Sequence, residues 1–247
     1  MNNSLDGKTA LVTGASSGIG RATAFELASK GADLALASRR VDRLKAIATD
    51  VESRHDVDVH PVKTDITDPT AVQALVEATV DEFGGIDVAV SNAGRTCPWN
   101  VESLSLEEFQ GVLDVNVTGA FLVTREVLPY LREVDGNLVY VGSFAGKYPR
   151  PFNPVYAASK WWLRGFAFSI AGKYGDEGIG IGLVNPTEVR TEIGGDYGDS
   201  LKEKFEPGEV SEPEEIAEAI AFVATRESPN AVAELDLFRR DKFGGFD

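Results

Sequence analysis

The stretch Thr13-Gly14-Ala15-Ser16-Ser17-Gly18-Ile19-Gly20 follows a short apolar run and opens a segment with helical periodicity. Its glycines let the backbone turn tightly and approach a pyrophosphate with no Cβ in the way. The free N–H groups and the positive dipole end of the following helix point at the same anion. Because the loop links the first strand to the first helix, it predicts a dinucleotide site. The residues expected to contact the dinucleotide are Gly14, Ser16, Ser17, Gly18, Ile19 and Gly20.

Apolar runs like the one before this loop recur along the chain and alternate with helical segments. Val, Leu, Ile and Ala occupy consecutive positions in them, which is typical of strands buried on both faces of a parallel sheet. The alternation predicts an α/β fold of the Rossmann type, doubly wound, with a seven-stranded parallel sheet and helices on both faces. We expect one catalytic domain over residues 1–247. The expected strands are Thr9–Thr13, Asp33–Ser38, Val57–Val62, Ile86–Ser91, Asn137–Val141, Ile179–Val184 and Glu234–Phe238.

Capping residues indicate where three of the helices begin. Asp68 precedes Pro69, an N-cap followed by proline at the first helical position. Ser105 is followed by Glu108, a capping box that opens a long helix towards Leu131. We expect the same device at the start of a late helix, from Ser211, Pro213 and Glu214.

The end of the second strand indicates which dinucleotide binds. An acidic residue at this place normally accepts hydrogen bonds from the adenosine ribose hydroxyls. Here the sequence has Ser38, followed by Arg39 and Arg40. A small hydroxyl leaves room for a 2′-phosphate, and a guanidinium pairs with that phosphate. The sequence therefore favours NADP over NAD, with Arg39 as the main contact and Arg40 adding to the field. The alternative is that both arginines are simply solvated at a helix start.

Further residues occur in an order that is typical of one enzyme family. They are Thr13–Gly20, Asp65, Asn92-Ala93-Gly94, Asn116, Ser143, and Tyr156 with Lys160. On these motifs the chain, from Lys8 to about Phe238, resembles the short-chain dehydrogenases/reductases. The resemblance implies an oxidoreductase that transfers a hydride between NADP(H) and a small alcohol or carbonyl substrate.

The reactive group implied by the resemblance centres on Tyr156 and Lys160. They are four residues apart, so they share one face of a helix. A neighbouring ammonium and the oxidised nicotinamide both favour phenolate and lower the tyrosine pKa. The resemblance makes Tyr156 the general acid or base, and Lys160 a ligand of the nicotinamide ribose. It also implies that Ser143 donates a hydrogen bond to the substrate oxygen and that Asn116 holds a water for proton relay.

The resemblance also implies further contacts to the cofactor. Asp65 would bond the adenine amino group with help from the Ile66 backbone, and Asn92, Ala93 and Gly94 would approach the adenosine ribose. A simple loop carboxylate is the alternative for Asp65. Around the nicotinamide we expect Pro186, Thr187, Val189 and Thr191.

Two positions depart from the family pattern. Ser91 stands where the family usually has asparagine, and Thr187 where it usually has glycine. The second change reduces backbone freedom beside the nicotinamide. The segment from about 187 to 210 carries several glycines and carboxylates, the composition of a mobile substrate lid or of an ordinary surface loop.

No motif identifies the substrate. The segment Ala233–Phe243 looks more like family members acting on small hydroxy acids or amino-acid alcohols than like those with a glycine-rich ending. The positions expected to face the substrate are Arg95, Trp99, Phe144, Tyr148, Arg150, Phe152 and Tyr197.

Charge limits the partners. The chain has 39 acidic and 24 basic residues, a formal net charge of −15 and an isoelectric point near 4.6. Repulsion disfavours nucleic acid and anionic membranes as partners. The surface resembles that of proteins from high-salt cytoplasm, where carboxylates keep the molecule hydrated. A mildly acidic cytosolic enzyme is the alternative, and the sequence leaves both open.

Targeting and metal-binding signals are weak. The start of the chain, Met1 to Lys8, is polar and lacks the apolar core of a signal peptide. No apolar run reaches the roughly 18 residues of a membrane span. We therefore expect a cytoplasmic protein. The single cysteine, Cys97, excludes an internal disulfide, and His55 and His60 lack metal-ligand spacing, so we expect no metal.

The helix after Tyr156 carries large apolar residues on more than one face, and one sheet contact cannot bury them all. We therefore expect a homodimer or homotetramer. Two other functions stay open: an NAD-dependent enzyme of the same mechanism, and a non-catalytic dinucleotide-binding sensor. The apolar residues concerned are Trp161, Trp162, Phe166 and Phe168.

Overall fold

A computed structural model describes residues 4–98 and 100–242 and contains, within them, one seven-stranded sheet. The strand order is β3-β2-β1-β4-β5-β6-β7, and every neighbouring pair is parallel. This confirms the predicted doubly wound fold, although several strand ends differ from expectation by one or two residues. The strands are β1 Thr9–Thr13, β2 Asp33–Ser38, β3 Val59–Lys63, β4 Val88–Ser91, β5 Asn137–Val141, β6 Gly180–Pro186 and β7 Glu234–Leu237.

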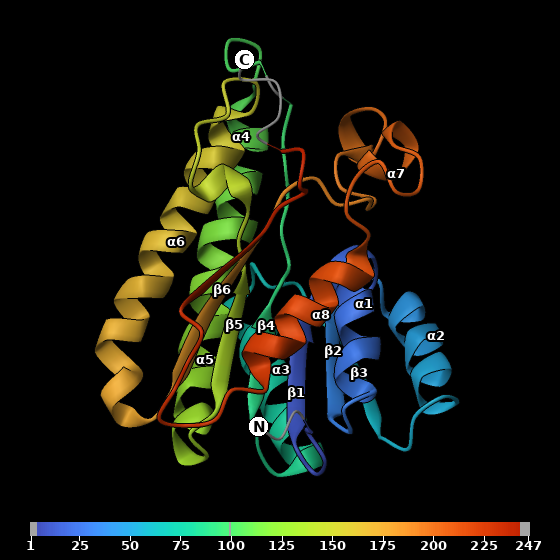
Figure 1. The fold of residues 1–247 in the computed structure, drawn as a ribbon, viewed down its shortest axis with the longest axis vertical. Coiled ribbons are helices and arrows are strands. Elements are labelled where there is room, and N and C mark those ends of the chain that lie inside the picture. The colour runs from blue at the N-terminus through green and yellow to red at the C-terminus, as the bar shows by residue number, and fades with distance from the viewer. Residues whose placement is uncertain (1–3, 99, 243–247) are drawn as a thin grey trace.

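Helices cover both faces of this sheet (Figure 1). Alternate strand residues explain the consecutive apolar runs: Ala10 and Val12 of β1 pack into one buried layer and Leu11 into the other. The first layer is closed by α1, α2 and α8, and the second by α3, α5 and α6. The helices are α1 Gly18–Ala28, α2 Val41–Glu52, α3 Pro69–Phe83, α4 Leu106–Leu113, α5 Ala120–Glu133, α6 Pro154–Tyr174, α7 Leu201–Lys204 and α8 Pro213–Ala224.

The chain order places a crevice at the carboxyl end of β1. After β1 the chain winds outwards to β2 and β3, and it then returns to place β4 on the other side of β1. The loops that follow β1 and β4 therefore run in opposite directions and leave space between them, where ligands of such sheets bind. In Figure 1 the segment that holds α7 stands beyond this end of the strands.

The long helix expected from Ser105 towards Leu131 is present but is not uniform. α4 passes into a π-helical segment, Asp114–Gly119, before α5 continues to Glu133. Ser105 forms the predicted capping box with Glu108. The π segment carries Asn116, and such wide turns are frequent at functional sites.

The other two predicted helix starts have different outcomes. The Asp68 carboxylate accepts a hydrogen bond from the Thr70 backbone, as an N-cap should. The prediction of Ser211 as an N-cap is wrong, because Glu212 caps α8 and forms a capping box with Glu215. Pro213 is the first helical residue, so the cap is the residue directly before it. No helix in residues 4–98 and 100–242 is long and apolar enough to cross a membrane.

Candidate active site

A cleft of about 650 Å³ opens beyond the carboxyl ends of the central strands. This volume is in the range of small-molecule and cofactor sites. All of the predicted site residues except Gly20 and Asn116 line the cleft. The lining members are Gly14, Ser16, Ser17, Gly18, Ile19, Ser38, Arg39, Arg40, Asp65, Ile66, Asn92, Ala93, Gly94, Ser143, Tyr156, Lys160, Pro186, Thr187, Val189 and Thr191.

The glycine loop is held open by backbone conformations that favour glycine. Gly14 and Gly18 have φ of +66° and +51°, in the left-handed region. Gly20 serves a different purpose, since a Cβ there would lie 2.4 Å from the Gly14 carbonyl oxygen. Gly20 therefore lets the first turn of α1 pack directly on the loop.

The end of β4 is tied to the same loop. The Thr13 hydroxyl accepts hydrogen bonds from the backbone N–H of Asn92 at 3.0 Å and of Ala93 at 3.2 Å. The Asn92 side chain donates to the Thr13 carbonyl at 2.8 Å. Asn92 thus fixes two strand ends relative to each other, a role that the sequence did not indicate.

Tyr156, Ser143 and Lys160 meet at the inner end of the cleft. Ser143 follows β5 and caps a short 3-10 helix, and its hydroxyl is hydrogen-bonded to Tyr156. The Lys160 ammonium lies 5.8 Å from the centre of the Tyr156 ring and donates to the Val141 carbonyl at 2.9 Å. The structure thus brings the predicted reactive residues together.

Burial is the largest cause of the pKa shifts of Tyr156 and Lys160. It raises the pKa of Tyr156, which the hydrogen bond from Ser143 and the charge of Arg150 partly offset. Burial also lowers the pKa of Lys160 to about 8. The cation that lowers the tyrosine pKa here is Arg150, which the sequence had assigned only to the substrate wall.

The Asn116 side chain is almost fully buried, with 2% exposure. Its Nδ2 donates to the Arg95 carbonyl and to the Ser159 hydroxyl, both at 2.9 Å, and its Oδ1 accepts from the Arg95 N–H at 2.8 Å. Both amide hydrogens are therefore used, and one lone pair of Oδ1 is left for a water.

The corner beyond β2 holds three arginines and one carboxylate. Arg40 donates to the hydroxyls of Ser16 at 3.0 Å and Ser17 at 2.6 Å, so its guanidinium lies on the glycine loop. Arg40 and Arg43 both donate to Glu192, at 2.9–3.0 Å. The sequence did not single out Arg43 or Glu192, because this contact joins α2 to a segment about 150 residues later in the chain.

Arg39 and Asp65 lie nearby. Burial raises the pKa of Asp65, but the Thr67 N–H and hydroxyl and the charge of Arg39 outweigh it and lower that pKa overall. The Asp65 Oδ1 accepts both bonds from Thr67, at 3.0 and 2.8 Å. The carboxylate therefore shapes its own turn as well as lining the cleft.

Thr187 fits where the family pattern has glycine. Among the described residues Asp135 is the one non-glycine with positive φ, so Thr187 needs no left-handed backbone. Its hydroxyl is buried in the cleft wall and has no hydrogen-bond partner within the described part of the chain. A polar ligand would satisfy it.

The predicted substrate wall is only partly present. Arg95 and Tyr197 line the cleft. Phe144 and Tyr148 are instead stacked with ring centres 4.4 Å apart, outside the cleft lining, and Arg150 pairs with Glu188. Phe238 lies edge-on to both Phe144 and Tyr148, so the two stacked rings pack against the C-terminal segment. Also outside the lining is Phe152, whereas Trp99 and Phe243 lie outside the described residues.

No cluster of three or more His, Cys, Asp or Glu side chains suited to a metal ion occurs in the described ranges 4–98 and 100–242. The fold and the glycine-loop cleft define a nucleotide-binding protein of the Rossmann class. The chain belongs to the short-chain dehydrogenases, since the family model of that description matches residues 8–202. This confirms the family resemblance and makes the protein an oxidoreductase.

Several known proteins are similar to this chain over nearly its whole length. An NADP-dependent 3-hydroxy acid dehydrogenase of Schizosaccharomyces pombe is 36% identical and covers 95% of this chain and 93% of its own. The structure of an alcohol dehydrogenase from Thermococcus sibiricus, complexed with 5-hydroxy-NADP, has a TM-score of 0.86 at 31% identity and covers 93% and 95%. The structure of a 3-ketoacyl-(acyl-carrier-protein) reductase from Brucella melitensis, complexed with NADH, has a TM-score of 0.83 at 30% sequence identity. The match covers 95% of this chain and 98% of the reductase.

Proposed function

We propose that the protein transfers a hydride between NADP(H) and a small alcohol or carbonyl compound, with Tyr156 as general acid and base. The observation that carries this proposal is the Tyr156 hydroxyl, hydrogen-bonded to Ser143 beside the buried Lys160 ammonium, in the cleft that the glycine loop lines. A tyrosine and a lysine on one helix face are common in proteins. Their combination with a serine hydroxyl and a dinucleotide-binding loop in one cleft is not.

The cleft residues fit NADP. The glycine loop and the N-terminus of α1 suit a pyrophosphate, and β2 itself ends in Ser38, a small residue that leaves room for a 2′-phosphate. Arg39 and Arg40 supply positive charge there, and the unpartnered Thr187 hydroxyl suits a carboxamide. NADPH supplies the hydride in reduction, and NADP⁺ accepts it in oxidation. The fission-yeast relative is named NADP-dependent, whereas the Brucella structure holds NADH, so NAD stays the alternative.

The protein's own groups handle the proton. In reduction Tyr156 donates its proton to the carbonyl oxygen while Ser143 donates a hydrogen bond to the same oxygen. Lys160 stabilises the phenolate that remains. Asn116 holds the water through which the proton is replaced. Oxidation runs these steps in reverse, with the Tyr156 phenolate taking the alcohol proton.

Tyr156→Phe tests the mechanism. Turnover should fall by about 10²- to 10⁴-fold, because the proton donor is lost. Affinity for NADPH, measured by fluorescence titration, should change less than about twofold. Tyr148→Phe is the matched control, since it removes the same hydroxyl from a ring outside the cleft lining. Unchanged turnover in Tyr156→Phe would refute the role, as would an equal loss in both variants.

The cofactor preference is tested separately. We expect kcat/KM to be higher with NADPH than with NADH, and Arg40→Ala to reduce that preference about tenfold or more, by loss of charge-assisted hydrogen bonds. Equal use of both cofactors by the unmodified enzyme would favour the NAD alternative. Tight NADPH binding without turnover, across a broad panel of carbonyls and alcohols at low and molar salt, would favour a sensor.

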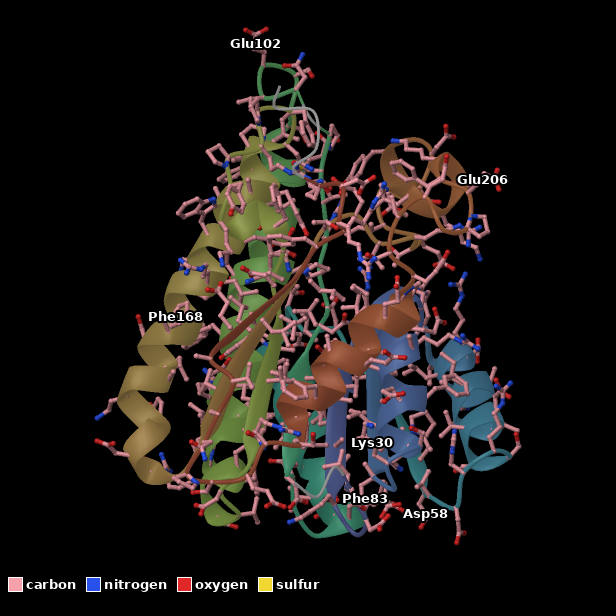
Figure 2. The ribbon with its side chains drawn as sticks, viewed as in Figure 1. Lys30, Asp58, Phe83, Glu102, Phe168 and Glu206 are labelled. Atoms are coloured by element: carbon pink, nitrogen blue, oxygen red, sulfur yellow. The ribbon has the colours of Figure 1, made fainter. Side chains whose placement is uncertain are left out.

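We also propose that α5 and α6 form a contact between copies of the chain. Trp161, Trp162 and Phe168 of α6 are 46%, 36% and 40% exposed, and Phe121 of α5 is 43% exposed. Figure 2 shows Phe168 on α6 at one edge of the molecule. Exposed aromatic groups of this kind mark association surfaces. Light scattering should give a dimer or tetramer, and Trp161→Glu should give a smaller species.

A further inference from the structure

The cleft is lined by a third arginine, Arg95, in addition to Arg39 and Arg40. Arg95 lines the cleft and makes no ion pair within residues 4–98 and 100–242. Arg150 and Lys242, by contrast, both pair with Glu188. Asp196 also lines the cleft, and its charge and that of Glu108 act on Arg95, although neither forms an ion pair with it within the described residues.

The guanidinium of Arg95 is held in a fixed place. Its Nη2 donates to the Tyr197 hydroxyl at 2.6 Å, and its Nε is buried with no partner in the described part of the chain. It lies over Gly111 of α4, where a Cβ would come within 2.6 Å of Nη1. The preceding residue, Gly94, is close to the Lys160 ammonium, at 3.7 Å from an ideal Cβ. A preorganised cation therefore lines the same cleft as Tyr156 and Lys160.

We propose that Arg95 and Tyr197 bind a carboxylate of the substrate, which makes the preferred substrates hydroxy acids and keto acids. Arg95 offers its unused N–H donors, and the Tyr197 hydroxyl, which accepts from Arg95, keeps its own proton to donate. Charge-assisted bonds of this kind are about twice as strong as neutral ones. Tyr197 belongs to the segment at about 187–210, so a bound carboxylate would hold this segment against the cleft and make it the lid. This inference rests on the proposed hydride transfer.

The test compares keto acids with their amides, which have the same shape and no charge. The unmodified enzyme should prefer the acid about tenfold or more in kcat/KM. Arg95→Met should reduce that ratio to about one, and Arg95→Lys should restore part of it. Arg54→Met, a change of the same kind just after α2 and outside the cleft lining, should leave the ratio intact.

Binding of the same acids to the enzyme with NADP⁺, by calorimetry, gives a readout that is independent of turnover. Loss of acid and amide turnover in equal measure in Arg95→Met would overturn the proposal and indicate a purely structural role. So would an unmodified enzyme that shows no preference for the acid. Absence of turnover with every carbonyl, together with acid binding, would instead refute the proposed hydride transfer alone.

A second inference comes from the other end of the cleft. Glu192, from the segment before α7, accepts hydrogen bonds from Arg40 at 3.0 Å and from Arg43 at 2.9 and 3.0 Å. Arg40 holds the Ser16 and Ser17 hydroxyls with its other nitrogens. A carboxylate thus occupies guanidinium donors that the proposed 2′-phosphate would also use.

We infer that Glu192 competes with the 2′-phosphate for Arg40 and Arg43, so that NADP binding releases the lid from α2. Glu192→Gln should then tighten binding of 2′,5′-ADP by about fivefold and leave that of 5′-AMP nearly unchanged, because the removed pairs are exposed and individually weak. Glu206→Gln is the control. Figure 2 shows Glu206 at the outer side of the lid, and it should affect neither ligand.

The outcomes separate this competition from the cofactor preference itself. If the unmodified protein binds 5′-AMP as tightly as 2′,5′-ADP, the NADP preference is refuted and the competition falls with it. If 2′,5′-ADP is preferred and Glu192→Gln weakens it or leaves it unchanged, Glu192 is instead a supporting ligand of the arginines, and the inference is overturned.

Discussion

Replacing Lys160 by methionine should stabilise the cofactor-free protein while removing its activity. The Lys160 side chain has 5% exposure, and its ammonium donates to the Val141 carbonyl. It makes no ion pair within the described residues. Methionine fills a similar volume without a charge to bury. The enzyme thus accepts an unfavourable buried charge at the place where its chemistry needs one.

The magnitude follows from the protonation of Lys160. Burial lowers its pKa from 10.5 to about 8. At about 1.36 kcal/mol per unit this corresponds to roughly 3 kcal/mol of destabilisation at pH 7. Losing the hydrogen bond to Val141 offsets about 1 kcal/mol. We therefore expect Lys160→Met to raise the free energy of unfolding by about 2 kcal/mol, or the melting temperature by about 6 °C.

The effect depends on pH with a definite sign. Between about pH 8 and 10.5 the unfolded chain binds more protons at this lysine than the folded protein does. Its destabilisation is therefore complete below pH 8 and is lost as the pH rises towards 10.5. The difference between Lys160→Met and the unmodified protein should fall to near zero by about pH 10.

Urea unfolding without cofactor at pH 7 and pH 10, followed by tryptophan fluorescence, measures both quantities. Lys173→Met is the control, because this lysine is exposed near the end of the same helix. The reasoning is refuted if Lys160→Met is no more stable than the unmodified protein at pH 7. It is also refuted if the stability gap is the same at both pH values.

Two further variants test the packing around the site. Gly20→Ala places a Cβ 2.4 Å from a loop carbonyl, so NADPH affinity by fluorescence titration should fall about tenfold or more, whereas Gly165→Ala, in open space on α6, should not change it. Tyr140→Phe removes a fully buried hydroxyl bonded to Thr124 at 2.7 Å. Its free energy of unfolding, from urea titration, should fall by about 1 kcal/mol without loss of cofactor binding, and an effect on cofactor binding alone would contradict this account.

The sequence predicts those parts of the fold that depend on neighbours along the chain. The strands are readable because both faces of β1 are covered, so Ala10, Leu11 and Val12 are all apolar. Most predicted cofactor residues line the cleft because they follow strands, and parallel strands end at one edge of the sheet.

Features that depend on distant segments were not readable. Glu192 meets Arg40 across the fold, and no local pattern marks a carboxylate in a glycine-rich loop as a partner for α2. Phe144 and Tyr148 pack against Phe238 instead of lining the cleft, since the C-terminal segment returns beside them. The N-cap of α8 lies one residue later than predicted, because the position of Pro213 as first helical residue outweighs the preference for serine at the cap.

The hydrogen bonds between the Asn116 side chain and Arg95 involve only main-chain atoms of Arg95. Its amide bonds to the N–H and the carbonyl of Arg95 and leaves the guanidinium free. Whatever side chain stands at position 95 would be presented at the same place and in the same direction. The side chain at position 95, which we propose contacts the substrate, can therefore change without moving the residues proposed for proton transfer. A change at this one position is a direct route to redesigning which compounds the enzyme accepts.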